Sequence, residues 1–213
     1  MSPLRSFVLA PAIALIAGVA LGIFAPLLGT VDAPVIHVLH LVLAAGWSWA
    51  ALAFCVGLAC KSRIKSAVLA PAALAAGVIA YYVTKLAQGE FREWVNLDDP
   101  SQGTHIYWAG FLSKMLFWCA AAIVLGLLLG VAGHLGRNPE LRGVLFRASI
   151  PLVAIIETSM RLNVESSSQG AVAAATWNVT RLVAVAVLIF LVWHGVRSRS
   201  KRSINGQGFG VKP

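Results

Sequence analysis

The sequence predicts an all-α integral membrane protein, folded as a compact bundle of six transmembrane helices. The first observation behind this prediction is composition. Of the 213 residues, 59% are hydrophobic and only 12% are charged, whereas a soluble domain is about one quarter charged. The second observation is that six apolar segments reach the length of about 20 residues that a helix needs to cross a bilayer.

These six segments follow one another along the chain with short connections. They cover residues 7–28, 35–59, 67–86, 105–132, 143–162 and 170–195. The first is long for the apolar region of a signal peptide and no small-residue cleavage site follows it, so we interpret it as an anchor. Residues 1–196 are therefore expected to form one transmembrane domain. Residues 197–213 are basic and polar, and we expect this tail to be disordered.

Basic residues are concentrated on one side of the six-span arrangement. Twelve of the 17 lysines and arginines fall on the side that holds both termini, where Glu140 is the one acidic residue. The positive-inside rule places this side, with both termini, in the cytoplasm. We attribute the basic tail to this topology and to attraction by anionic membrane lipid, not to nucleic-acid binding.

Polar and aromatic side chains recur in the half of the spans that lies away from the cytoplasm. Residues three or four apart share a helix face, so His37, His40, Ala44 and Trp47 form a stripe on the second span. Four further spans carry similar stripes, and we expect all five to line one shared outer-leaflet cavity. The predicted ligand-binding residues are Trp47, Tyr81, Tyr82, Phe111, Lys114, Trp118, Arg161, Trp177, Asn178 and Arg181.

Glu157 is the one acidic residue inside a predicted span. An ionised carboxylate in hydrocarbon is costly, so this group must be paired, protonated or hydrated. Arg161, one helical turn later, could pair with it, as could Lys114 or Arg181 across the bundle. A dry apolar pocket would instead favour the protonated carboxyl group. The sequence leaves both interpretations open.

The connection 87–104 is acidic and is the longest between spans. We interpret GEFREWV within it as a short interfacial helix with Phe91 and Trp94 as apolar anchors. Asp98 and Asp99 precede Pro100, a pattern typical of a turn or a helix cap. These two carboxylates are also alternative proton donors.

No metal or cofactor is expected. Cys55, Cys60 and Cys119 lie in apolar runs, where thiols pack as small hydrophobic groups. His37 and His40 have a spacing that two ligands could use, but no carboxylate or cysteine pattern accompanies them.

Four segments resemble a family of small, largely uncharacterised six-span membrane proteins of actinobacteria: GWSWAALAF, AYYVT, LFWCAAAIVLGLLLGVAGHLGR and the glutamate of IPLVAIIE. This resemblance covers most of residues 47–161 and implies a multi-pass protein of a bacterial plasma membrane. In size and full membrane embedding the chain also resembles the drimentine-type terpene cyclases of actinobacteria. That resemblance implies protonation of an isoprenoid by a carboxylic acid, but no motif aligns, so it assigns no residue a role.

Two functions from different classes follow from these observations. The first is a metal-free terpene cyclase, a lyase or isomerase, with Glu157, Asp98 or Asp99 as the acid and aromatic rings that stabilise carbocations. The second is a transporter or binding subunit, in which Lys114, Arg161 and Arg181 attract an anion. These bases would also keep Glu157 ionised, which opposes the first function. Six short spans make a small transporter, so a homo-oligomer, or an accessory role beside a partner, is a further expectation.

Overall fold

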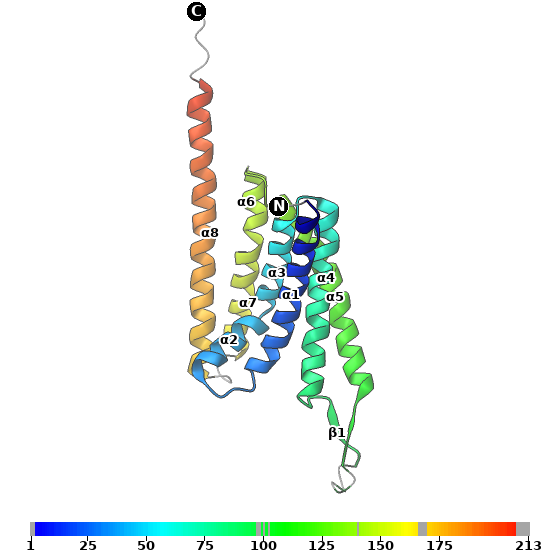
Figure 1. Cartoon of the computed structure of the whole chain (residues 1–213). Helices are drawn as coiled ribbons and strands as arrows, with labels where there is room; N and C mark the ends of the chain where they lie inside the picture. The colour runs from blue at the N-terminus through cyan, green and yellow to red at the C-terminus, as the bar shows by residue number, and fades with distance from the viewer. Residues whose placement is uncertain are drawn as a thin grey trace, which may run out of the picture. The chain divides into compact units, whose positions relative to one another are not determined.

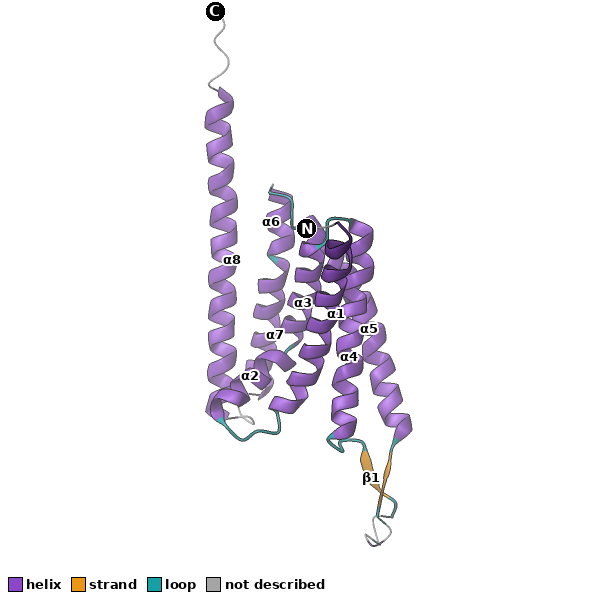
Figure 2. Cartoon of the chain, viewed as in Figure 1, coloured by secondary structure: helices purple, strands orange, loops and turns teal. Residues whose placement is uncertain are grey.

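The computed structural model describes residues 3–96, 99, 101, 103–139, 141–165 and 170–207. These residues are almost entirely helical, with one short β-hairpin (Figures 1 and 2). Five of their helices are long and apolar enough to cross a membrane, or six spans are present if one bent pair counts as a span. This confirms a mainly helical chain of the membrane type. The chain divides into two compact units, Met1–His134 and Leu135–Pro213.

The first unit contains five helices and the hairpin. The helices are α1 (Pro3–Leu28), α2 (Pro34–Ala44), α3 (Gly46–Ala59), α4 (Arg63–Ala87) and α5 (Trp108–Leu135). The strands are β1 (Arg92–Trp94) and β2 (Thr104–Ile106), which lie between α4 and α5.

The span predicted over 35–59 is bent instead of continuous. α2 and α3 meet at Ala45, whose backbone is extended (φ −69°, ψ 141°), and the two helices are bent by 59°. The Ser48 hydroxyl donates to the carbonyl of Val42 (2.5 Å), and the Trp49 indole donates to that of Leu43 (3.2 Å). Side chains thus satisfy backbone carbonyls beside the bend, as a membrane interior requires.

The same bend corrects the stripe predicted on this span. His37 and His40 lie on α2, whereas Trp47 lies on α3 beyond the break at Ala45. Helical spacing relates residues only within one uninterrupted helix. Trp47 therefore does not continue the face of the two histidines.

Glycines allow four helices of the first unit to approach one another closely. The Ser66 hydroxyl of α4 donates to the backbone carbonyl of Gly130 in α5. A Cβ atom added to Gly57 of α3 would overlap the same carbonyl oxygen. Similarly, a Cβ atom on Gly18 of α1 would overlap the carbonyl oxygen of Ala73 in α4. Small residues therefore set the distances between these helices, as is common in membranes.

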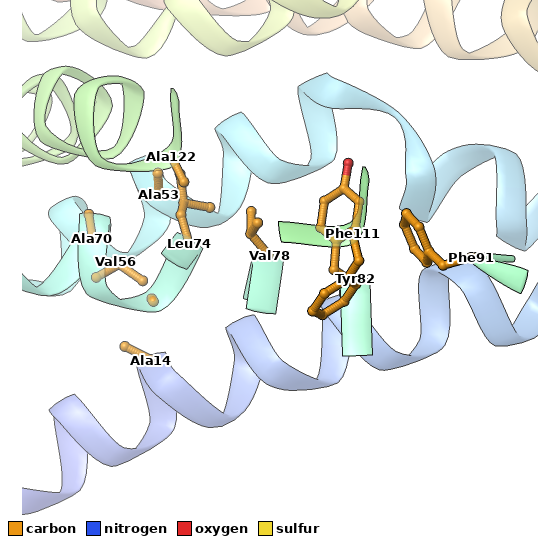
Figure 3. Close-up of a cluster of buried hydrophobic side chains, with 11 residues drawn as sticks. Ala14, Ala53, Val56, Ala70, Leu74, Val78, Tyr82, Phe91, Phe111 and Ala122 are labelled. Atoms are coloured by element: carbon orange, nitrogen blue, oxygen red, sulfur yellow. The ribbon is translucent and has the colours of Figure 1, made fainter. Parts of the chain in front are cut away.

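Buried side chains of the first unit form a continuous core. Small residues such as Ala14, Ala53 and Ala70 occupy one end of this core, and Tyr82, Phe91 and Phe111 occupy the other (Figure 3). Small side chains therefore allow close packing of helices at the first of these ends. The opposite end is filled by rings.

The connection between α4 and α5 is a hairpin, whereas the sequence predicted a short helix for GEFREWV. In the antiparallel pair, Arg92 lies opposite Ile106, Glu93 opposite His105 and Trp94 opposite Thr104. Gly89 has φ 84°, which interrupts the helical path before β1. Strands are favoured by aromatic and β-branched residues such as Trp94, Thr104 and Ile106. The sequence alone did not indicate that residues 92–94 would pair with residues 104–106.

The second unit contains three helices, α6 (Leu141–Arg147), α7 (Ser149–Glu165) and α8 (Gly170–Gln207). α7 and α8 pack against each other. Pro151 lies in the first turn of α7, where proline is tolerated and need not kink the helix.

The tail differs from the prediction of disorder from residue 197. α8 continues to Gln207, so residues 197–207 are helical. An existing helix extends without a new nucleation step, and Arg and Lys are good helix formers.

Candidate functional site

The residues predicted to bind a ligand fall into two groups, one in each unit. Glu157, Arg161, Trp177, Asn178 and Arg181 belong to the second unit, whose α7 carries an open hollow of about 450 Å³. Pockets of this size accommodate small molecules. The hollow is lined by Val153, Ile156, Glu157, Met160, Arg161 and Val164.

An ion pair lies in this mainly apolar hollow. The Nε of Arg161 donates to a carboxylate oxygen of Glu157 at 3.0 Å, and the side chains are 29% and 20% exposed, respectively. The pair forms because residues four apart on a helix are neighbours. Of the alternatives left open for Glu157, the structure therefore shows pairing with Arg161.

The ring of Trp177 on α8 also contacts the guanidinium of Arg161. The guanidinium carbon of Arg161 lies 4.9 Å from the centre of the Trp177 ring, within the range of a cation–π interaction. Trp177 is fully buried, with an exposed fraction of 0%. Arg161 is thus positioned by a carboxylate on its own helix and by an aromatic ring on the next helix.

Nearby polar groups of α7 and α8 are satisfied within their own helices. The buried hydroxyls of Thr158 and Thr176 donate to the carbonyls of Ala154 and Val172, at 2.6 and 2.8 Å. Arg181 donates to the side-chain oxygen of Asn178 at 2.9 Å. Asn178 and Arg181, both predicted to bind ligand, therefore contact each other, and neither lines the hollow.

In the first unit, aromatic rings form a chain near the hairpin. Tyr82 of α4, Phe91 before β1 and Phe111 of α5 are its buried members. Successive ring centres are separated by 6.2 Å from Tyr82 to Phe91 and by 5.3 Å from Phe91 to Phe111. The chain continues from Tyr82 to Tyr81 and Trp49, and from Phe111 to Trp108. Each ring packs against the next, so this group forms a packed aromatic core.

Two lysines lie against this aromatic chain. The Nζ of Lys114 is 5.7 Å from the centre of the Phe91 ring, and that of Lys85 is 5.1 Å from the centre of the Tyr81 ring. Lys85 also pairs with Glu90 at 2.8 Å. Rings and a carboxylate therefore compensate the positive charges at this end of the unit.

Three further predicted residues have other surroundings. Trp118 is half exposed and contacts the ring of Phe117. Asp99 accepts hydrogen bonds from the backbone amide and the hydroxyl of Ser101, at 3.2 and 2.6 Å, which is the turn geometry considered from the sequence. Asp98 lies outside the described residues.

Sequence reasoning did not include Phe91 or Ile156 among the site residues. Phe91 joins Tyr82 to Phe111, but its position depends on the hairpin, which was not predicted. Ile156 lines the hollow, and a usable signal exists for it, because it lies three residues after Val153 and four before Met160.

Among the described residues, no group of three or more His, Cys, Asp and Glu side chains is arranged to hold a metal ion. Residues 1–210 match a family model described as a family of unknown function, DUF6518. No curated protein and no solved structure matches the chain.

Proposed function

Because the chain belongs to DUF6518, a family of unknown function, we propose a function from the chemistry of its own side chains. The protein binds a lipid-soluble amphiphile, an isoprenoid-like chain with an anionic head group, at the hollow on α7. It does so as a multi-pass protein of a bacterial plasma membrane, with both termini in the cytoplasm. The positive-inside distribution of its basic residues supports this orientation.

The observation that carries the proposal is the partly exposed ion pair among apolar side chains. Glu157 and Arg161 sit in a hollow whose other lining residues are Val153, Ile156, Met160 and Val164. Charged groups within membrane spans are costly and are commonly found where a substrate or ion is bound. A hollow that contacted only lipid chains would be expected to lack these charged groups.

The ligand class follows from the arrangement of these groups. The guanidinium of Arg161 is planar, remains charged and suits carboxylate or phosphate oxygens. Its position is fixed by Glu157 and Trp177 before any ligand arrives, which lowers the ordering cost of binding. An apolar chain would lie along Val153, Ile156 and Val164.

The test compares two probes with the same chain and different head groups, farnesyl diphosphate and farnesol, on purified protein in nanodiscs. The diphosphate should bind at least about tenfold more tightly, which corresponds to about 1.4 kcal/mol. Arg161→Gln should remove this preference. Arg181→Gln is the matched control because Arg181 lies on α8 outside the hollow, and it should retain the preference. Equal binding of both probes, or no binding, would overturn the proposal.

A second candidate is the acid-initiated terpene cyclase, favoured by the position of a carboxyl group beside an apolar hollow. Glu157 would transfer its proton to an alkene carbon of the substrate, and a later loss of a proton from the carbocation would restore the acid. The pair with Arg161 opposes this function, so substrate binding would have to open it. Glu157→Gln would abolish product formation, whereas a variant with unchanged turnover would exclude Glu157 as the acid.

A further inference from the structure

The β1–β2 hairpin presents two chemically different faces. Side chains of directly paired residues point to the same side of a sheet, and successive side chains alternate. Arg92, Trp94, Thr104 and Ile106 therefore share one face, and Glu93 and His105 share the other. All six residues are exposed. The first face thus combines an indole, an aliphatic chain and a guanidinium with no carboxylate.

The hairpin lies directly at the ends of two candidate membrane spans (Figure 2). α4 and α5 contain 25 and 28 residues. At 1.5 Å per residue they are about 37 and 42 Å long, so both exceed the hydrocarbon thickness of about 30 Å. Their ends therefore reach the layer of lipid head groups, and β1 and β2 start from that layer.

The base of the hairpin is held against the helices. Phe91 is buried, with an exposed fraction of 7%, and packs on Phe111. The backbone amide of Tyr107 donates to the carbonyl of Phe91 at 2.8 Å. By contrast, Trp94 is 53% exposed and Ile106 is 37% exposed. These two apolar side chains are thus presented outward from an anchored base at the height of the membrane surface.

We propose that the face formed by Arg92, Trp94, Thr104 and Ile106 rests in the phospholipid head-group layer, with Arg92 bound to a lipid phosphate. Indole rings favour this layer because they are apolar on their faces and polar at their N–H groups. Arginine binds phosphate oxygens through two parallel donors. Glu93, on the opposite face, is directed away from the phosphates. This inference concerns the first unit and does not depend on the proposed function of α7.

The test uses fluorescence quenching to determine whether the Trp94 side chain contacts lipid or water. The full chain is placed in phosphatidylglycerol nanodiscs, with or without bromine atoms on the upper part of the lipid chains. Fluorescence of the unmodified protein minus that of Trp94→Phe gives the emission of Trp94. We expect brominated lipid to quench this emission severalfold more than aqueous iodide does. Iodide quenching without lipid quenching, or protection from both, would overturn the proposal.

Two further variants test the phosphate contact and the method. Arg92→Gln should reduce lipid quenching of Trp94 severalfold, whereas Glu93→Gln, on the other face, should leave it unchanged. Equal effects of the two variants would overturn the role of Arg92. The difference emission of Trp177→Phe is the control for a fully buried ring and should respond to neither quencher.

Discussion

The guanidinium of Arg161 lies 4.9 Å above the ring of Trp177, and this ring is completely buried. The contact joins α7 to α8, because the arginine belongs to one helix and the tryptophan to the other. Trp177 therefore fills space between the helices and also orients the guanidinium of Arg161. We expect the filling of space to contribute most to the free energy of unfolding, and the orienting contact to affect mainly ligand binding at the hollow.

Trp177→Ala should therefore lower the free energy of unfolding by about 3–5 kcal/mol, the range for removing a large buried ring. Trp193→Ala is the control on the same helix, because Trp193 is 54% exposed, and it should cost less than about 1 kcal/mol. Reversible unfolding in mixed micelles measures both values. Similar losses for the two variants would contradict the packing role of Trp177.

The pair of Glu157 and Arg161 should contribute modestly to stability. Both side chains are partly exposed, at 20% and 29%, so the coupling energy should be nearer to about 1 kcal/mol than to the 3–5 kcal/mol typical of breaking a fully buried pair. A double-mutant cycle with Glu157→Gln and Arg161→Gln isolates this term. A coupling energy of zero would show that the two groups do not interact.

Gly57→Ala should destabilise the first unit, because the new methyl group would overlap the backbone carbonyl oxygen of Gly130. Backbone cannot move away as a side chain can, so we expect a loss of about 1–3 kcal/mol. Gly110→Ala is a matched control, since its added methyl group would meet only the movable ring of Tyr107. Thermal unfolding of both variants in detergent provides the comparison. A larger loss for Gly110→Ala would contradict this account.

His40→Phe should weaken the attachment of α2 to α1. The Nδ1 of His40 donates to the carbonyl of Ala25 at 2.6 Å, and loss of this bond should cost about 0.5–1.5 kcal/mol. His37→Phe serves as the control because the ring of His37, one turn earlier, contacts the His40 ring and not that carbonyl. Hydrogen exchange at the end of α1 should accelerate only in the first variant.

Phe91→Ala should loosen the hairpin without unfolding the helices. The ring packs between Tyr82 and Phe111, so its removal takes away the apolar contacts that anchor β1. Local opening exposes a backbone to proteases. Limited proteolysis between α4 and α5 should accelerate severalfold for Phe91→Ala and change little for the exposed Trp94→Ala. Equal cleavage of the two variants would place the anchor elsewhere.

Hydrophobic length predicted most of the helices correctly, because a span of about 20 apolar residues has few alternatives in a membrane. The span over 35–59 shows where that signal ends. Composition is continuous across Ala45, yet the helix breaks there, with Ser48 and Trp49 satisfying nearby carbonyls. Hydropathy averages over such a segment and carries no information about a local break.

The candidate site was predicted in part for a related reason. The spacing of Glu157 and Arg161 on one helix made their pair one of the alternatives expected from the sequence, since such a pair depends on local geometry alone. The partner of Arg161 on the next helix, Trp177, required packing between helices. The order of rings around Phe91 likewise depended on strand pairing, which three-residue strands do not reveal in sequence.

The bend at Ala45 differs in kind from one made by proline. Two side-chain donors, the hydroxyl of Ser48 and the indole N–H of Trp49, bind backbone carbonyls beside it, whereas proline removes a backbone donor permanently. The bend between α2 and α3 is therefore formed without the loss of a backbone donor.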